Sequence, residues 1–233
     1  MGEYERFKLI DYVFKYVIAG DTSSGKTTFT YYLQHNKFLD VHDTTIGVDF
    51  SSKTLDMKNG KRIKVQLWDT AGQEQYNSII KSYFRDPIGC IIVLDVTNMR
   101  KTLLNQLKKW EKKVLESTNN EENMKILVLI NKMDFFSVQY KQAEINEVIE
   151  YCEKKKYLVY ETSCKKGTNV YESIYDFTYL IYETISKKID NTKIKGVKNR
   201  EILDKYYTVD LRDTRDESND KGRDNYCSGC IVC

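Results

Sequence analysis

Residues 20–27 combine glycines, a lysine and a threonine at the spacing that binds phosphate groups. They read Gly-Asp-Thr-Ser-Ser-Gly-Lys-Thr and fit the pattern G-x-x-x-x-G-K-[ST]. The glycines let several backbone N–H groups converge on a β-phosphate, Lys26 brings a cation to the β- and γ-phosphate oxygens, and the Thr27 hydroxyl is a ligand for Mg²⁺. A glycine-rich turn without a ligand is the alternative, but an apolar run precedes the loop and a helical pattern follows it, as phosphate binding requires. The residues that we expect to surround the phosphates are Asp21, Thr22, Ser23, Ser24, Gly25, Lys26, Thr27 and Thr28.

A second polar segment follows an apolar run at residues 69–74, Asp-Thr-Ala-Gly-Gln-Glu. The Asp69 carboxylate can hold Mg²⁺, usually through water, because this ion keeps part of its hydration shell. Gly72 lets the backbone approach a γ-phosphate, and the amide of Gln73 can orient a water molecule for attack. Taken alone, the segment is equally compatible with an ordinary polar strand end.

Two further polar segments predict recognition of a guanine base. The first, residues 131–134 (Asn-Lys-Met-Asp), follows another apolar run. A carboxylate at Asp134 accepts both N–H donors on one edge of guanine, and adenine does not present that pattern. Asn131 can support the loop, and the stem of Lys132 can lie along the base. The second, residues 161–165, can offer a backbone N–H to the base oxygen. Each segment alone also occurs in ordinary loops, but the four together, in this order, favour a guanine-nucleotide site.

Alternating strands and helices position these segments. Strands are predicted at residues 16–19, 48–57, 62–69, 90–94, 126–130 and 157–160. Helices are predicted at residues 27–34, 100–117, 140–155 and 170–188. The Asn59–Gly60 pair between the second and third strands indicates an antiparallel hairpin. In the last helix, Ile174, Phe177, Leu180, Ile181 and Ile185 form the expected apolar side. The order predicts an α/β fold of three layers, with a mostly parallel six-stranded sheet, one antiparallel hairpin and helices on both faces.

Composition excludes several other classes of protein. The chain has 233 residues, enough for one α/β domain. Its net charge is only +3 although 30% of its residues are charged, so we expect no nucleic-acid partner. No apolar run approaches the roughly 18–20 residues of a membrane span, and the N-terminus is too polar for a signal peptide. Six cysteines without such a signal indicate a reducing compartment.

The polar segments together resemble the Ras superfamily of small GTPases, and three stretches are similar to its Rab family. These stretches are residues 46–50 (Ile-Gly-Val-Asp-Phe), residues 64–74 and the C-terminal cysteines. The resemblance covers residues 12–188 and leans toward the early secretory, Golgi and endosomal branch. It implies the P-loop GTPase fold, GTP or GDP bound with Mg²⁺, and slow GTP hydrolysis.

The resemblance also implies a role for individual residues. Thr45 would give its hydroxyl to Mg²⁺ and its N–H to the γ-phosphate, and Phe38 would lie edge-on to the guanine. The implied catalytic residues are Gln73, Lys26 and Thr45, and the implied metal ligands are Thr27, Thr45 and Asp69. Beyond the phosphate loop, the implied nucleotide-binding residues are Phe38, Thr45, Gly72, Asn131, Lys132, Asp134, Ser163, Cys164 and Lys165. The implied effector surface is Ile46, Phe50, Trp68 and Tyr83, for which packing in the core is the alternative.

Departures from the family pattern leave a second function open. Thr22 and Ser23 stand where Rab proteins usually have glycine or another small residue, and they add side chains near the γ-phosphate. The chain is therefore read as a GTPase switch or, alternatively, as a GTP-locked scaffold that binds effectors with negligible turnover. A P-loop kinase or ATPase is poorly supported, because residues 131–134 favour guanine.

The expected domains are an N-terminal extension at residues 1–12, a GTP-binding domain at residues 13–188 and a flexible tail at residues 189–233. The tail holds nine Lys/Arg and nine Asp/Glu, so it lacks a polybasic anchor. It ends with Cys227, Cys230 and Cys233, and prenylation is expected at Cys230 with one of the other two as a second site. Free thiols or a partial zinc site are the alternatives.

The resemblance implies a set of partners and a location. The partners are a guanine-nucleotide exchange factor, a GTPase-activating protein, a prenylation escort, a GDP-dissociation inhibitor and effectors of vesicle trafficking. The location is the cytoplasmic face of intracellular membranes, most often Golgi, endosomal or vesicular, where the prenyl groups anchor the chain, together with a cytosolic pool.

Overall fold

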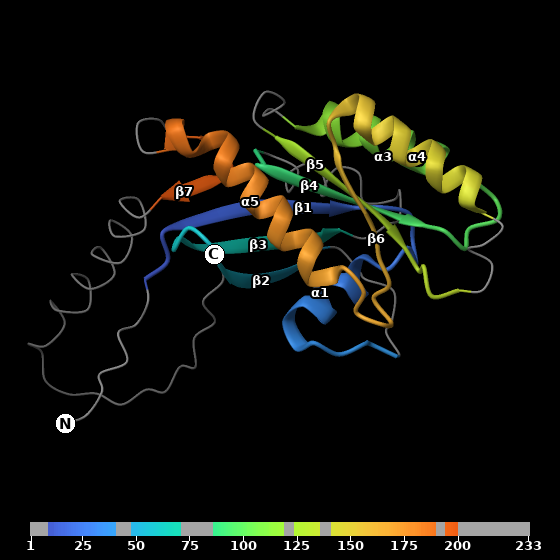
Figure 1. Cartoon of the computed structure of the whole chain (residues 1–233), viewed down its shortest axis with the longest axis horizontal. Helices are drawn as coiled ribbons and strands as arrows, with labels where there is room; N and C mark the ends of the chain where they lie inside the picture. Colours follow the sequence, from blue (N-terminus) through green and yellow to red (C-terminus); the bar gives the residue numbers. More distant parts are fainter. Residues whose placement is uncertain are drawn as a thin grey trace, which may run out of the picture. The chain divides into compact units, whose positions relative to one another are not determined.

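A mixed β-sheet lies at the centre of the fold, with helices on both of its faces (Figure 1). The computed structural model describes residues 9–40, 48–70, 86–118, 124–135, 141–189 and 194–199. The strands are β1 (Tyr12–Ala19), β2 (Val48–Asp56), β3 (Arg62–Thr70), β4 (Gly89–Asp95), β5 (Lys125–Asn131), β6 (Leu158–Glu161) and β7 (Val197–Asn199). The helices are α1 (Lys26–His35), α3 (Leu103–Ser117), α4 (Gln142–Lys155) and α5 (Val170–Ile189).

The sheet has the strand order β2-β3-β1-β4-β5-β6, and β7 pairs with β1. β2 runs antiparallel to β3, with Phe50 opposite Trp68, because a turn at Gly60 reverses the chain. β1 pairs in parallel with β3 and with β4, and β5 pairs in parallel with β4 and with β6. The predicted α/β fold, with a mostly parallel sheet and one antiparallel hairpin, is confirmed, and β7 adds a seventh strand to the six predicted.

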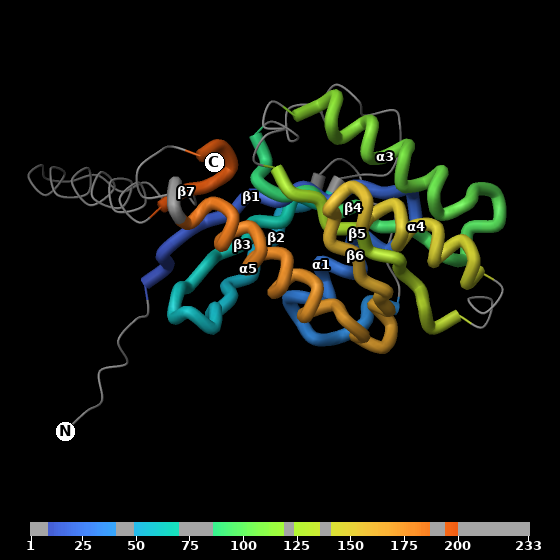
Figure 2. The backbone as a smooth tube through the Cα atoms, turned by 45° about the horizontal axis from the view of Figure 1, so that its top comes forward, coloured from blue at the N-terminus to red at the C-terminus, as the bar shows by residue number. Residues whose placement is uncertain are grey.

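Two apolar cores fill the space between the sheet and its helices. On one face, Phe14, Tyr16 and Ile18 of β1 pack with side chains of α1 and α5. On the other face, Val17 and Ala19 of β1 pack with side chains of α3 and α4. Figure 2 shows these two pairs of helices on opposite sides of the sheet. Because successive side chains of β1 enter different cores, both sets must be apolar, and the strand appears in the sequence as a continuous apolar run.

Helix α5 differs from its prediction at one position. Ile174, Phe177, Ile181 and Ile185 are buried as expected, but Leu180 is 37% exposed. The buried side chains form one stripe at the spacing of an α-helix, and position 180 lies beside that stripe rather than within it. Leu180 is therefore not part of the core.

The short strand β7 was not foreseen from the sequence. Its residues Val197 and Asn199 lie opposite Phe14 and Tyr12 of β1, in antiparallel register. The backbone N–H of Lys15 donates to the carbonyl of Gly196 at 2.8 Å. The part of the chain that packs on the sheet therefore extends to Asn199, beyond the predicted domain end at residue 188.

Tyr12 of the predicted N-terminal extension lies in β1, and Val197–Asn199 of the predicted flexible tail form β7. Residues 1–8 and 200–233 lie outside the described part of the chain, so for them the extension and the tail stay predictions. Among the described helices, none has both the length and the apolar character needed to cross a membrane.

Candidate functional site

The four polar segments of the sequence lie at the same edge of the sheet. Residues 20–27 follow β1, and Asp69 is the next-to-last residue of β3. Residues 131–134 begin at the end of β5, and residues 161–165 begin at the end of β6. These four strands are parallel to one another, so their carboxyl ends meet at one side of the sheet. Ligands of open α/β sheets bind at this edge.

Two glycines allow the phosphate loop to pack closely against its neighbours. Gly25 has φ +101°, and a Cβ placed on it would lie 2.3 Å from Asn131 Nδ2. Gly20 has φ +152°, and a Cβ placed there would lie 2.5 Å from the carbonyl oxygen of Val93 in β4. Real Cβ atoms do not approach so closely, so the loop reaches this position only with glycine at both sites.

Lys26 is held inside the phosphate loop by backbone carbonyls. Its Nζ atom donates to the carbonyls of Gly20 and Asp21 at 3.1 and 3.0 Å, and its side chain is buried. Burial lowers the pKa of Lys26, while the charges of Asp69 and Asp21 act in the opposite direction. α1 begins at Lys26, and no side chain caps its first backbone N–H groups. A buried cation next to uncapped helix N–H groups is a favourable environment for phosphate oxygens.

Thr27 and Asp69 bring two oxygen atoms together at the mouth of the loop. The Thr27 hydroxyl donates to Asp69 Oδ2 at 2.5 Å, and Asp69 is only 1% exposed. Both are hard oxygen ligands of the kind that Mg²⁺ prefers. The described residues contain no group of three or more His, Cys, Asp or Glu side chains around one point. Mg²⁺ needs no such group when water and phosphate oxygens complete its shell, so this pair fits the ion.

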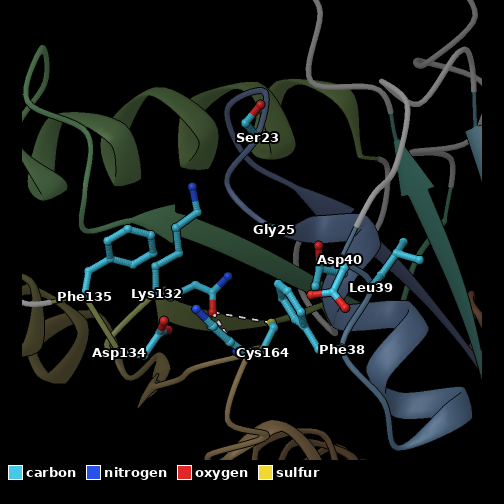
Figure 3. A pocket seen from close by; sticks show the side chains of 12 residues that line it. Ser23, Gly25, Phe38, Leu39, Asp40, Lys132, Asp134, Phe135 and Cys164 are labelled. Atoms are coloured by element: carbon cyan, nitrogen blue, oxygen red, sulfur yellow. Dashed lines mark hydrogen bonds between the residues drawn. The ribbon is translucent and has the colours of Figure 1, made fainter.

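A pocket of about 330 Å³ opens beside the phosphate loop. Figure 3 shows Lys132, Asp134 and Phe135 on one side of it, Phe38, Leu39 and Asp40 on the other, and Cys164 between them. The remaining lining residues are Ser23, Gly25, Thr28, Asn131 and Lys165. The volume lies in the usual range for small-molecule sites. Three of the predicted phosphate-loop residues (Ser23, Gly25 and Thr28) and most of the predicted base-binding residues therefore line the same pocket.

Asp134 is oriented by the loop that follows β6. Its Oδ1 atom accepts a hydrogen bond from the Ser163 hydroxyl at 2.6 Å, and its side chain is half-buried at the pocket wall. This bond fixes the carboxylate without neutralising its charge. A carboxylate held in this way is available for two N–H donors of a ligand.

Asn131 joins three loops of the site. Its Nδ2 atom donates to the carbonyl of Ser24 in the phosphate loop at 2.9 Å. Its Oδ1 atom accepts from the Thr162 hydroxyl at 3.3 Å and from the backbone N–H of Cys164 at 3.4 Å. The predicted supporting role of Asn131 thus corresponds to observed contacts with both neighbouring segments.

Cys164 contributes a thiol to the floor of the pocket. It is 4% exposed, and its Sγ atom donates to Asn131 Oδ1 at 3.4 Å. Burial raises the pKa of Cys164 to about 12, with a smaller opposing effect of the hydrogen bond to Asn131. The thiol is therefore protonated at neutral pH and serves as a hydrogen-bond donor.

Several residues of the site were missed from the sequence. Leu39, Asp40 and Phe135 line the pocket, and only their position next to Phe38 and Asp134 in the chain indicated this. Asp95, at the end of β4, holds Lys132 Nζ at 2.7 Å. Its own backbone is fixed by Gln106 of α3, which accepts from its N–H and donates to its carbonyl. An acidic residue at the end of a predicted strand was the available signal for Asp95.

Phe50 and Trp68 lie next to each other on the hairpin, with Phe50 exposed and Trp68 half-buried against the core between the sheet and helices α3 and α4. Phe50 is 47% exposed, and its ring centroid lies 4.9 Å from that of Trp68 in an edge-on arrangement. Lys15 Nζ lies 5.4 Å from the Trp68 ring. This pair of aromatic side chains is available to a partner, whereas Ile46 and Tyr83 lie outside the described residues.

Other predicted site residues also lie outside the described part of the chain. They are Thr45, Gly72, Gln73, Cys227, Cys230 and Cys233. In the phosphate loop, Thr22 and Ser23 are exposed, whereas Ser24 and Thr28 are buried.

Comparison with protein families agrees with this arrangement. The model of the Ras family matches residues 15–183, which is almost three quarters of the chain. The match includes the phosphate loop, the Thr27–Asp69 pair and both segments that line the base side of the pocket. The chain therefore belongs to the Ras family of small GTPases.

Proposed function

We propose that the chain is a Rab-like switch that binds GTP or GDP with Mg²⁺, hydrolyses GTP slowly and recruits effectors in vesicle trafficking. The proposal rests on the shared pocket: the phosphate loop and the Asp134 side chain line it together, and Asn131 connects the loops that hold them. The family match to residues 15–183 supports a guanine-nucleotide switch in general.

The chain's own residues divide the work of hydrolysis. Lys26 stabilises negative charge on the β- and γ-phosphate oxygens, and Gln73 orients the attacking water. Thr27, Thr45 and Asp69 would hold Mg²⁺, which would neutralise charge on the phosphates. Gly72 and Thr45 sense the γ-phosphate, so that the segments around them present different surfaces in the GTP and GDP states.

Nucleotide choice is tested at Asp134. A carboxylate there accepts two N–H donors of guanine, whereas the amide of Asp134→Asn presents one acceptor and one donor. The variant is expected to bind GDP at least about a hundredfold more weakly and to prefer xanthosine diphosphate, which carries a carbonyl at the second position. Equal affinity of wild type and variant for GDP, measured by fluorescence titration, would contradict guanine recognition by this residue.

The exposed Phe50 ring, backed by the half-buried Trp68, supports the role in effector recruitment, because aromatic anchors dominate many protein interfaces. In this role the chain works with an exchange factor, a GTPase-activating protein, a prenylation escort and a GDP-dissociation inhibitor. It acts at the cytoplasmic face of Golgi, endosomal or vesicular membranes and has a cytosolic pool.

The second candidate function is a hydrolysis-impaired scaffold that stays in the GTP state. The exposed side chains of Thr22 and Ser23 favour it, because they occupy the outer side of the phosphate loop. Single-turnover hydrolysis of preloaded GTP distinguishes the two functions, using wild type, Gln73→Leu and Thr22→Gly. If the chain is a switch, wild type hydrolyses GTP slowly, Gln73→Leu nearly abolishes hydrolysis, and Thr22→Gly changes the rate little. If the chain is a scaffold, wild type hydrolyses GTP no faster than Gln73→Leu, and Thr22→Gly restores hydrolysis.

Membrane attachment is tested at the C-terminal cysteines. One lipid chain binds membranes only marginally, so prenylation at Cys230 and a second lipid at Cys227 or Cys233 are proposed. Mass spectrometry of protein isolated from its native cell should detect lipid-modified C-terminal peptide. Detection of unmodified peptide alone would refute the proposal.

A further inference from the structure

The carboxylate of Asp21 points to helix α3 and accepts three hydrogen bonds from that region. Lys109 Nζ and Trp110 Nε1 both donate to Oδ1 at 2.9 Å, and Lys101 Nζ donates to Oδ2 at 3.1 Å. Burial acts to raise the pKa of Asp21, but these hydrogen bonds outweigh it and place the pKa below its ordinary value. The carboxylate is thus ionised and fully engaged by α3, although Asp21 stands within the phosphate loop.

The backbone of the same residue holds the catalytic lysine. The carbonyl of Asp21 accepts from Lys26 Nζ at 3.0 Å and from the N–H of Ser24 at 3.2 Å. Asp21 therefore faces α3 with its side chain and Lys26 with its backbone. If the loop shifts when the side-chain hydrogen bonds are lost, the Asp21 carbonyl moves as well, and this carbonyl places the Lys26 ammonium group together with the carbonyl of Gly20.

Helix α3 is itself held in place by core packing and by hydrogen bonds to its neighbours. Trp110 is 6% exposed and packs in the core between the sheet and helices α3 and α4. The neighbouring Glu111 is buried and accepts hydrogen bonds from Tyr151 of α4 and from Tyr157, both at 2.7 Å. Lys109 Nζ lies 5.2 Å from the Trp110 ring centroid, which fixes the ammonium group between the ring and the Asp21 carboxylate.

We propose that helix α3 holds the phosphate loop in its nucleotide-binding conformation through Asp21, so that Lys101, Lys109 and Trp110 are positioning residues for bound nucleotide. This inference rests on the proposed binding of GDP and GTP. All three side chains donate hydrogen bonds to the Asp21 carboxylate, and in this proposal they act through Asp21.

The proposal predicts an effect on the rate of nucleotide release. Without its anchor on α3, the loop samples more conformations, and the Lys26 ammonium leaves its position near the phosphates. Changes of affinity within one site appear mainly in the dissociation rate. Loss of the Lys109 contact is expected to accelerate GDP release by about tenfold, which corresponds to about 1.4 kcal/mol.

The test measures release of a fluorescent GDP analogue from the full chain in excess Mg²⁺ and unlabelled GDP. Lys109→Met and Lys101→Met should each accelerate release, with the larger effect at Lys109, which is the less exposed of the two. Lys112→Met is the matched control, because Lys112 lies on the same helix and pairs with Glu116 instead of Asp21. Lys109→Arg keeps a donor and a positive charge, and it should restore a rate within about twofold of wild type.

A double-mutant cycle shows whether the effect passes through Asp21. If it does, Lys109→Met accelerates release in wild type but adds nothing to Asp21→Ala. A full additional effect in the Asp21→Ala background overturns the proposal, and so does a rate for Lys109→Met equal to that of Lys112→Met. Failure of wild type to bind the GDP analogue would overturn the proposed function and this inference with it, whereas tight binding with equal release rates overturns this inference alone.

Discussion

Gly25 and Asn131 lie in direct contact because the phosphate loop and the loop after β5 share the edge of the sheet. The contact leaves no space for a side chain, and the φ of +101° disfavours any residue other than glycine. Gly25→Ala must therefore displace Asn131 Nδ2 and the Ser24 carbonyl to which it donates.

The prediction is that Gly25→Ala weakens GDP binding by at least about tenfold, since a strained backbone alone costs about 1–3 kcal/mol. Fluorescence titration measures it. Gly60→Ala is the matched control, because Gly60 also has a positive φ of +81° but a Cβ there would meet nothing within 4 Å. Equal weakening in both variants would mean that general destabilisation of the fold, and not the position of Gly25 beside Asn131, weakens binding.

Cys164 provides a second prediction for a single residue. Its thiol is buried, and a pKa of about 12 leaves almost no thiolate at pH 8, so iodoacetamide should not modify it in the folded protein. Mass spectrometry of peptides should find Cys164 alkylated only after denaturation. Rapid modification of the folded, GDP-bound chain would contradict the buried position of the thiol.

Short motifs allowed most residues of the site to be predicted, because each motif fixes a residue type and its place relative to a strand. Lys26, Thr27, Asp69, Asn131 and Asp134 all lie at the predicted edge. Asp21 was expected among the residues around the phosphates, and the structure adds that its carboxylate contacts α3. Its partners stand 80–89 positions later in the sequence, and no local pattern predicts such a pairing.

At the scale of elements, β7 ties the segment after α5 to the start of β1. Ile194 is buried, and Lys195 pairs with Asp86 at 3.4 Å. Gly196 has φ +77°, and a Cβ there would lie 2.5 Å from the backbone nitrogen of Ile88. The segment therefore packs against the chain that leads into β4.

We expect Gly196→Val to break this packing and to lower the melting temperature of the GDP-bound protein by several degrees. A loss of 1 kcal/mol corresponds to about 2–4 °C for a domain of this size. Differential scanning calorimetry measures the change. Truncation after residue 193 should lower the melting temperature similarly, and truncation after Asn199 should not. A shortened chain ending at residue 193 that melts like the full chain would refute a stabilising role for β7.

The strands and helices with long periodic patterns were predicted within a few residues of their ends, because burial on one or both faces imposes the pattern. β7 has only three residues, too few for any periodicity. Its position depends on close packing of Gly196 against the backbone of residues 86–88, which lie far away in the sequence. Leu180 shows the same limit within a helix, since spacing alone does not define the edge of a buried stripe.

At the scale of the whole molecule, the two cores bury acids that the folded chain keeps protonated. Burial is the main cause that raises the pKa of Cys152 and of Tyr151 to about 12, and the charge of Glu111 adds to it. Burial also raises the pKa of Cys90 and of Tyr16 far above their ordinary values. Burial lowers the pKa of Lys26, so this group changes the pH dependence of stability in the opposite direction. The groups whose pKa is raised outnumber it.

These shifts predict that the protein loses stability in alkaline solution. An unfolded chain releases the cysteine protons near pH 9 and the tyrosine protons near pH 10, whereas the folded chain retains them to about pH 12. Between these values the unfolded state binds fewer protons, so the free energy of unfolding falls as pH rises, by at most about 1.4 kcal/mol per pH unit for each group. The full contribution of these groups to the free energy of unfolding is present below pH 9.

Urea unfolding at pH 8, 9, 10 and 11 should give a steadily falling midpoint. In Cys152→Ala, which lacks one of these acids, the midpoint should start lower because of the cavity but fall less steeply above pH 9. Parallel curves for wild type and variant would show that Cys152 does not titrate in this range, and that its burial does not couple folding to pH.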